Sequence, residues 1–281
     1  MIRRILALTL TLSTLTAHAA DETVFDTHVH LHNGEASLRA YEADVAAAHI
    51  KLVGIGAMWF GGPNQALAGD PEKMRASNDA HFALAAKHPE ITPFVTVHPY
   101  DGQAALDELV RVAGRGAKVL KLHPHTQKFD ASDPRVLALV RKAGDLGVVV
   151  LFDNANILPG DSERLFNLAI SAPKTKFIFA HIGGMSFRFW NMLALARTAD
   201  KFFSDNIYFD ISATVFLVGD SPIKDEFVWT LRNVGIDHVL LGSDYPQLSL
   251  SKTLAAFHHL GLTDEEQAKI RFENAQKLLG R

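Results

Sequence analysis

The sequence predicts an α/β fold of one domain, a (β/α)8 or TIM barrel, and two observations favour it. Short β-branched or aromatic runs alternate with helical patterns along the chain, at a spacing of about 26 to 40 residues that suits one strand–helix unit. Without its first 19 residues the chain of 281 keeps 262, close to the roughly 250 residues typical of this barrel. The runs begin near Val24, Leu52, Thr92, Lys118, Val148, Lys176, Ile207 and His238.

Helix starts in the same series carry capping residues. Asp133 precedes Pro134, which combines an N-cap with a first-turn proline, and the segment from Thr263 to Glu266 has the capping-box pattern. A two-domain doubly wound sheet would also alternate strands with helices, but it is expected to place a Gly-x-Gly-x-x-Gly turn after the first strand. The segment from Asp26 to His30 stands there instead. The barrel is therefore the better prediction.

The N-terminus has the three parts of a signal peptide. Two arginines at positions 3 and 4 precede the apolar residues 5–16, and Ala17-His18-Ala19 offers small residues for cleavage after position 19. We expect a signal peptide over 1–19, a barrel over 20–281 and a periplasmic or secreted mature protein without stable membrane insertion. An uncleaved membrane anchor is the alternative, and the paired arginines leave the export route, Sec or Tat, open.

The composition restricts the partners and the kind of metal site. A formal net charge of −3 and 21% charged residues argue against nucleic acid or an anionic membrane as the main partner. We expect a small-molecule substrate. A homo-oligomer is left open. The chain has no cysteine, so any metal site would use His, Asp, Glu or a modified Lys, which suits zinc, manganese or iron.

Titratable residues stand at the ends of five predicted strands, where a barrel builds its active site. Strand side chains alternate between two faces, so Asp26, His28 and His30 are predicted to share one face of the first strand. The same alternation predicts that Phe177, Phe179 and His181 share a face of the sixth strand. The other strand-end candidates are Lys121, His123, Asp153 and Asp244.

The His28-x-His30 pair is the strongest local signal for a metal. Two imidazoles two residues apart on a strand can reach one cation, and Asp26 could orient one of them by a hydrogen bond. Each residue also has an ordinary structural interpretation: strand histidines, a buried histidine at His181, or a turn residue at Asp244. Their joint occurrence at strand ends, in this order, favours the metal site.

Four segments and the C-terminal tail carry a family resemblance that covers nearly the whole mature chain. They resemble the motif blocks and closing helix of the amidohydrolase-related ("amidohydrolase 2") family, which includes lactonases, hydratases and non-oxidative decarboxylases of the aminocarboxymuconate-semialdehyde type. The segments are Asp26-Thr27-His28-Val29-His30, Lys121-Leu122-His123-Pro124, Ala180-His181-Ile182-Gly183-Gly184, Gly242-Ser243-Asp244-Tyr245-Pro246 and the tail from Arg271 to Gly280.

The resemblance implies roles for these positions. His28 and His30 would bind a divalent metal, usually zinc or manganese. Asp244 would be a ligand and the catalytic acceptor of a proton from the metal-bound water, and His181 would be a ligand or a catalytic residue that polarises the substrate. The chain departs from the family on the fifth strand, where Asp153 stands in place of a metal-binding histidine. Asp153 either completes a His2Asp2 site or marks a site that has lost its metal.

Lys121 and His123 stand on the fourth strand, where some members of the superfamily carry a carboxylated lysine between two metals. A binuclear centre would lack its usual fifth-strand ligand here. We therefore expect Lys121 and His123 to bind a substrate carboxylate or carbonyl. The alternative is a lysine whose stem packs on the barrel wall. Aromatic residues after strand ends, such as Trp59, Phe60 and Phe187, predict either an apolar pocket rim or loop packing.

The predicted function is metal-dependent hydrolysis of an ester, lactone or amide bond in a small organic substrate. One divalent metal, zinc in the first place and manganese as the alternative, would activate a water molecule, with Asp244 as acid and base. Two alternatives stay open. They are a metal-dependent non-oxidative decarboxylase of an aromatic or dienoic acid, and an exported binding protein that has lost catalysis.

Overall fold

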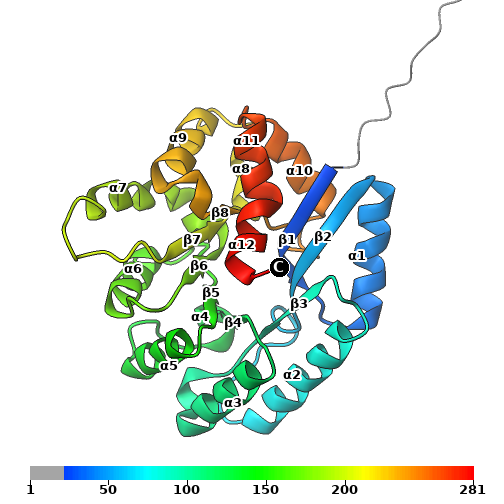
Figure 1. The fold of residues 1–281 in the computed structure, drawn as a ribbon, viewed down its shortest axis with the longest axis vertical. Helices are drawn as coiled ribbons and strands as arrows, with labels where there is room; N and C mark the ends of the chain where they lie inside the picture. The colour runs from blue at the N-terminus through cyan, green and yellow to red at the C-terminus, as the bar shows by residue number, and fades with distance from the viewer. Residues whose placement is uncertain (1–21) are drawn as a thin grey trace, which may run out of the picture.

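Eight parallel strands lie side by side in chain order in the computed structural model, which describes residues 22–281 (Figure 1). Each predicted strand start falls within two residues of an observed one, so the predicted TIM barrel is confirmed. The predicted signal peptide and its cleavage site lie outside the described residues. The strands are β1 (Glu22–His30), β2 (Ile50–Met58), β3 (Ile91–Val95), β4 (Val119–Leu122), β5 (Val149–Phe152), β6 (Phe177–Phe179), β7 (Ile207–Asp210) and β8 (Val239–Leu240).

Helices surround the strands, and the last helix, α12, lies across the centre of the ring in Figure 1. Among residues 22–281, no helix is both long and apolar enough to cross a membrane. The helices are α1 (Glu35–Ala47), α2 (Pro71–Ala85), α3 (Gln103–Gly114), α4 (Pro124–Gln127), α5 (Pro134–Asp145), α6 (Asp161–Ser171), α7 (Met192–Ala196), α8 (Thr214–Val218), α9 (Lys224–Val234), α10 (Leu250–His258), α11 (Asp264–Ala268) and α12 (Asn274–Leu279).

Both predicted helix starts are confirmed. The Asp133 carboxylate accepts a hydrogen bond from the Arg135 backbone N–H at 2.8 Å at the start of α5. At α11, Thr263 and Glu266 form a reciprocal capping box. Each such cap typically stabilises a helix by about 1 kcal/mol, so these residues define where the helices begin.

Backbone hydrogen bonds between β1 and the segment after β8 close the barrel. The Thr27 N–H donates to the Leu241 carbonyl at 3.0 Å, and the Asp244 N–H donates to the His28 carbonyl at 2.8 Å. The His30 N–H donates to the Tyr245 carbonyl, also at 2.8 Å. This seam places His28, His30 and Asp244 beside one another at one end of the barrel.

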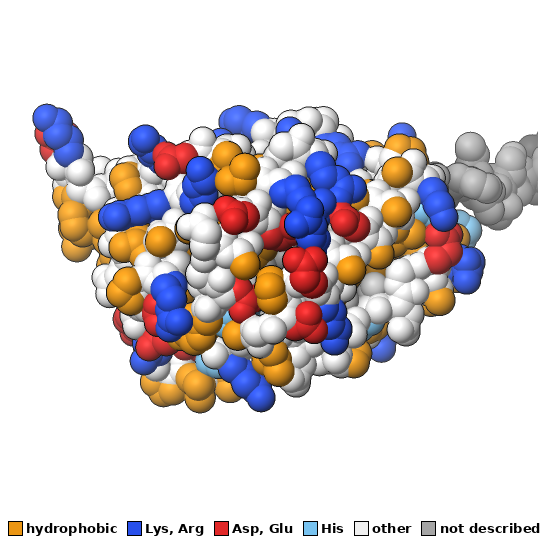
Figure 2. Space-filling model, turned by 90° about the horizontal axis from the view of Figure 1, so that it is seen from below, with side chains coloured by type: hydrophobic (Ala, Val, Ile, Leu, Met, Phe, Trp, Pro, Cys, Tyr) orange, Lys and Arg blue, Asp and Glu red, His pale blue; other side chains and the backbone are white. Residues whose placement is uncertain are grey.

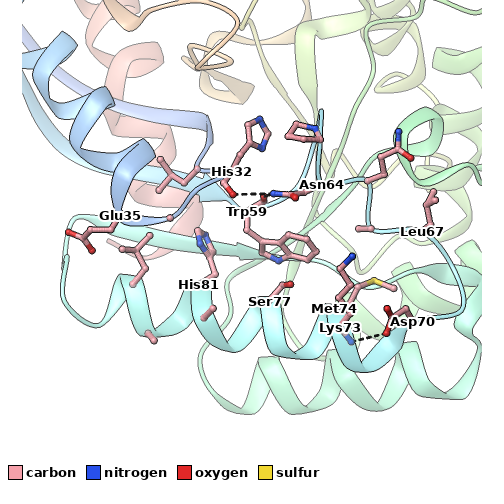
Figure 3. A pocket seen from close by; sticks show the side chains of 18 of the residues that line it. His32, Glu35, Trp59, Asn64, Leu67, Asp70, Lys73, Met74, Ser77 and His81 are labelled. Atoms are coloured by element: carbon pink, nitrogen blue, oxygen red, sulfur yellow. Dashed lines mark hydrogen bonds between the residues drawn. The ribbon is translucent and has the colours of Figure 1, made fainter.

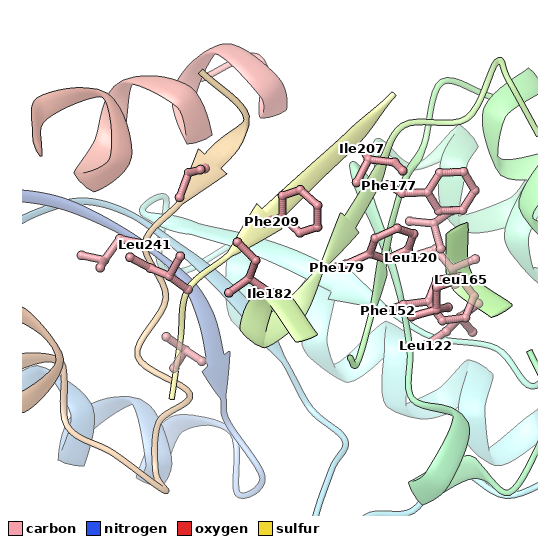
Figure 4. Packing of buried hydrophobic residues seen from close by; sticks show 14 of the residues in the cluster. Leu120, Leu122, Phe152, Leu165, Phe177, Phe179, Ile182, Ile207, Phe209 and Leu241 are labelled. Carbon is pink, nitrogen blue, oxygen red and sulfur yellow. The ribbon is translucent and has the colours of Figure 1, made fainter. Parts of the chain in front are cut away.

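Two buried layers stabilise the barrel. Inside the strands, the rings of Phe25 and Phe94 pack in a cluster that Ala275 and Leu279 of α12 also join. Gly56 makes room for this layer, because a Cβ atom there would overlap the Phe94 ring. A larger layer, part of which Figure 4 shows, packs the outward residues of the strands against helices. Truncating such a buried phenylalanine to alanine typically costs about 3–5 kcal/mol.

The surface carries both signs of charge. On the face that Figure 2 shows, Lys and Arg side chains are interspersed with Asp and Glu. Because the two signs are mixed, that face has no broad region of positive or negative electrostatic potential. The predicted absence of a nucleic-acid partner stays a prediction from composition.

A candidate metal centre at the mouth of the barrel

The polar strand ends meet in a cavity of about 180 Å³ at the C-terminal end of the barrel. The cavity includes all seven side chains that the sequence singled out for metal binding, catalysis or substrate binding, although they come from five strand ends. It is lined by His28, His30, His32, Gly61, Gly62, Lys121, His123, Asp153, His181, Asp244, Pro246 and Gln247.

Three of these residues form the arrangement best suited to a metal. The Nε2 atoms of His28 and His30 lie 3.5 and 3.4 Å from Oδ1 of Asp244, and the three ligand atoms lie within 4.8 Å of one another. Two imidazole nitrogens and one carboxylate oxygen are a donor set that zinc and manganese accept. With ligand bonds of about 2.0–2.2 Å, such spacings fit one shared ion. The residues therefore fit a mononuclear metal site.

The rear nitrogens of both histidines are hydrogen bonded, which turns each Nε2 toward the cavity. Nδ1 of His30 lies 2.7 Å from the Phe60 carbonyl, an acceptor only, so Nδ1 carries the proton. Nδ1 of His28 lies 2.9 Å from the Asp210 carboxylate. Partners of this kind fix the tautomer in which Nε2 is free to bind a metal.

Asp26 does not orient either ring, so that prediction was wrong. Its carboxylate accepts hydrogen bonds from the Tyr41 hydroxyl at 2.9 Å and the Ser243 N–H at 2.8 Å. The cause is a break in the pairing register of β1 between Asp26 and Val29, which ends the simple alternation of faces. Burial raises the pKa of Asp26 to about 6, although these hydrogen bonds oppose the rise.

Sequence reasoning missed two residues of the site. Asp210, at the C-terminal end of β7, is a buried carboxylate against His28. The strand-end rule that selected Asp153 would have found it, because β7 ends in Phe209-Asp210. His32 continues the alternation after His30 and stacks on its ring, with centroids 5.3 Å apart.

On the opposite side of the cavity, Asp153 lies between two histidines. Its Oδ1 is 3.2 Å from Nε2 of His181, and its Oδ2 is 3.6 Å from Nδ1 of His123. Nδ1 of His181 lies 3.0 Å from the Ser212 carbonyl, so both nitrogens of His181 face acceptors. Burial opposes a charged imidazole, but the Asp153 carboxylate outweighs it and raises the pKa of His181 to about 9.

His181 reaches the cavity by a route that strand alternation did not predict. Ile178 and Ala180 of this segment pack in the inner layer, while Phe177 and Phe179 pack in the outer layer. The chain turns sharply after β6, with positive φ of 59° at His181 and 44° at Ile182. The predicted shared face of Phe177, Phe179 and His181 was therefore wrong, although His181 does line the site.

Lys121 lies in the floor of the site and is only 1% exposed. Its Nζ is 3.4 Å from Nε2 of His28, and it forms no ion pair with a carboxylate among residues 22–281 within the usual 4 Å. Burial lowers the pKa of this amine. Burial, together with Lys121, also lowers the pKa of His28 to about 4. His28 is thus neutral at pH 7, as a metal ligand must be.

A larger cavity of about 760 Å³ lies beside the metal centre, between the loop after β2 and helix α2 (Figure 3). His32 lines both cavities. The Trp59 ring lines the larger one and donates a hydrogen bond to Asn78 at 3.0 Å. Phe60 and Phe187 are fully buried, so for them the packing alternative holds, and the cavity at the metal centre has a largely polar lining.

Comparison with known proteins shows the family. The family model described as Amidohydrolase matches residues 25–281, so the chain belongs to the amidohydrolase family, as the motif resemblance predicted. No curated protein matches the sequence.

Solved structures share the fold at low sequence identity. The 5-carboxyvanillate decarboxylase of Sphingomonas paucimobilis is 16% identical, with a TM-score of 0.66 over 86% of this chain and 82% of that one. The 2,6-dihydroxybenzoate decarboxylase from Rhizobium is 17% identical, with a TM-score of 0.67 over 92% and 98%. A dihydroxybenzoic acid decarboxylase from Polaromonas sp. JS666, with bound manganese and the inhibitor 2-nitroresorcinol, is 15% identical, with a TM-score of 0.62 over 92% and 97%.

Proposed function

We propose that this protein is a divalent-metal-dependent enzyme that removes carbon dioxide from a small aromatic or unsaturated carboxylic acid. The observation that carries the proposal is that one cavity holds a metal-binding cluster and, opposite it, a buried imidazole in contact with a carboxylate. His28, His30 and Asp244 would hold one metal, and His181 with Asp153 would hold a proton opposite it. The names of the three decarboxylases with this fold add support.

The cavity has suitable groups for a carboxylic acid substrate. When bound, the metal would supply positive charge and coordination positions for substrate oxygens. Lys121 and His123 would bind the carboxylate by charge-assisted hydrogen bonds. As the bond from carbon to the carboxyl group breaks, its electron pair stays on the carbon, which takes the proton that His181 holds. Carbon dioxide leaves, and one solvent proton restores His181.

Hydrolysis of an ester, lactone or amide is the second candidate, and Asp244 favours it. Its carboxylate lies against the two histidines and faces the cavity, where it could accept a proton from a water molecule. Burial raises the pKa of Asp244, but the contact with His30 and the charge of the nearby His181 lower it below its usual value, which favours the ionised carboxylate. Both reactions would use the same metal cluster.

Product analysis separates the candidates. The purified protein, loaded with manganese or zinc, is incubated with hydroxybenzoic and dienoic acids and, separately, with lactones and esters in ¹⁸O-labelled water. We expect carbon dioxide release without ¹⁸O in the organic product. Incorporation of ¹⁸O with no carbon dioxide would establish hydrolysis instead. Tight ligand binding with no turnover in either panel would support a binding protein that has lost catalysis.

The Asp244→Asn variant tests the role of the carboxylate. The amide keeps the shape but loses the charge of a proposed metal ligand and proton acceptor, so activity is expected to fall at least about 10²–10⁴-fold. Thermal unfolding of the metal-free protein is the control for folding. Wild-type activity in a folded Asp244→Asn protein would overturn both the ligand role and the acid–base role of Asp244.

Export and cleavage of the N-terminal segment are proposals that rest on the sequence of residues 1–19. N-terminal sequencing of the protein recovered from a periplasmic extract is expected to begin at position 20. A full-length chain found only in the cytoplasmic fraction would contradict the proposed periplasmic or secreted location.

A further inference from the structure

Asp210 connects two sides of the site without lining the cavity. It is fully buried at the end of β7, and its two oxygens have different partners. Oδ2 lies 2.9 Å from Nδ1 of His28. Oδ1 accepts hydrogen bonds from the backbone N–H of Ser212 at 3.0 Å and of His181 at 3.2 Å, and from the Ser212 hydroxyl. The carboxylate therefore ties the His28 ring to the backbone after β6 and β7.

We propose that Asp210 is a positioning residue that holds His28 in the tautomer and ring orientation required for metal binding. A carboxylate accepts the Nδ1 proton, so the lone pair stays on Nε2, which faces Asp244 and His30. A buried carboxylate is costly unless its hydrogen bonds are satisfied, and here both oxygens are satisfied. The proposal rests on the proposed metal site but not on the reaction.

Because the two oxygens of Asp210 have different partners, the orientation of an asparagine amide at this position can be predicted. Two backbone N–H groups point at Oδ1, so the NH2 of an asparagine cannot occupy that position without placing donors against donors. In Asp210→Asn the NH2 group must instead face His28. His28 would then accept at Nδ1 and carry its proton on Nε2, the nitrogen that should bind the metal.

Asp26 supplies a matched control. It is also a fully buried aspartate, and its Oδ1 also accepts from backbone N–H groups, those of Ser243 at 2.8 Å and His28 at 3.1 Å. Its other oxygen accepts from the Tyr41 hydroxyl instead of an imidazole. Asp26→Asn therefore makes the same chemical change at a similar depth without a ring to reorient.

The experiment measures metal affinity and the tautomer of His28. Competition with a chromogenic chelator should show manganese and zinc binding weakened about 10–100-fold in Asp210→Asn and within about threefold of wild type in Asp26→Asn. In ¹⁵N-histidine NMR spectra of the metal-free protein, His28 should carry its proton on Nδ1 in wild type and on Nε2 in Asp210→Asn. Assignment uses the signal missing from His28→Gln.

Three results would overturn the positioning role. They are unchanged metal affinity in Asp210→Asn, an equal loss in Asp26→Asn, and a wild-type His28 whose proton lies on Nε2. If Asp210→Asn fails to fold, the tautomer of His28 in the wild-type protein still tests the positioning role. A wild-type protein that binds neither metal would refute the proposed function, whereas the tautomer measurement would still test Asp210.

Discussion

Two aspartate–histidine pairs lie on opposite sides of one cavity and make different use of the imidazole. On the β7 side, Asp210 contacts the rear nitrogen of His28, Nδ1, and leaves Nε2 free. On the β5 side, Asp153 contacts Nε2 of His181, while the rear nitrogen faces the Ser212 carbonyl. The same two residue types thus leave Nε2 open to a metal in one place and hold it against a carboxylate in the other.

The pKa shifts of the two histidines depend on the charges around each ring. Burial and the neighbouring Lys121 lower the pKa of His28 to about 4, in spite of Asp210. His181 is buried as well, but the Asp153 carboxylate, with Asp244 and Asp210 nearby, raises its pKa to about 9. A metal ligand must be neutral and a proton donor must be protonated. The contact of Asp210 with Nδ1 leaves Nε2 of His28 open to a metal, whereas the charges around each ring decide which imidazole is protonated.

Loss of bound metal is the largest effect that we expect to distinguish the two aspartate–histidine pairs. His28→Ala and His30→Ala each remove a proposed ligand and should lose most of the one equivalent of metal expected in wild type. Asp153→Ala should keep its metal, because the Asp153 carboxylate bonds to His181 and lies outside the His28, His30 and Asp244 cluster. Elemental analysis after dialysis measures all three variants.

The opposite result for Asp153 would be equally informative. If Asp153→Ala loses its metal as completely as His28→Ala does, Asp153 is a ligand, as the sequence comparison with the family suggested, and the two sides of the cavity form one His2Asp2 site. The pairing of Asp153 with His181 would then belong to the metal-free protein alone.

The Asp153→Asn variant tests whether Asp153 keeps His181 charged, because it should change how the stability of the fold depends on pH. A histidine whose folded pKa is raised from 6.5 to about 9 stabilises the fold fully below pH 6.5, and this stabilisation is lost as pH rises through 9. Between pH 6.5 and pH 9 we expect the free energy of unfolding of the metal-free wild type to fall by an amount on the order of 3 kcal/mol. In Asp153→Asn it should fall far less. Thermal unfolding from pH 6 to 9.5 measures the difference.

Activity gives a second readout of the same group. If His181 must be protonated, the wild-type rate should fall above about pH 9, and in Asp153→Asn this fall should move toward neutral pH. Identical pH profiles in the two proteins would mean that Asp153 does not control the proton of His181.

The sequence alone could predict the fold and the members of the site, because both depend on local patterns. Runs of apolar residues mark the strands, and in a barrel the C-terminal strand ends meet at one mouth. His28, Asp153 and Asp244 could therefore be assigned to one cavity without knowledge of their contacts.

The hydrogen-bond partner of each histidine ring could not be predicted from the sequence, because it depends on places where the chain departs from regular strand geometry. The register break in β1 turns Asp26 toward Tyr41, and positive φ at His181 brings that ring into the site against strand alternation. Asp210 and His28 are separated by 182 residues. Which carboxylate accepts from which nitrogen is set by the closure of the barrel.

Among these variants, Ser212→Ala should have the smallest effect on metal binding. The Ser212 hydroxyl lies between the two aspartate–histidine pairs. Its Oγ is 3.3 Å from Nδ1 of His28 and 3.0 Å from Nδ1 of His181. Each nitrogen has another acceptor, Asp210 for His28 and the Ser212 carbonyl for His181, and the substitution keeps both. Losing one hydroxyl hydrogen bond, worth about 0.5–1.5 kcal/mol, should weaken metal binding at most about tenfold.

The chelator competition that measures Asp210→Asn also measures Ser212→Ala, so the two variants can be ranked directly. A loss in Ser212→Ala as large as that in Asp210→Asn would mean that the hydroxyl, through its hydrogen bond to the carboxylate, is what holds Asp210 against His28. In that case the carboxylate and the hydroxyl act as one unit, and the two sides of the cavity are coupled through Ser212.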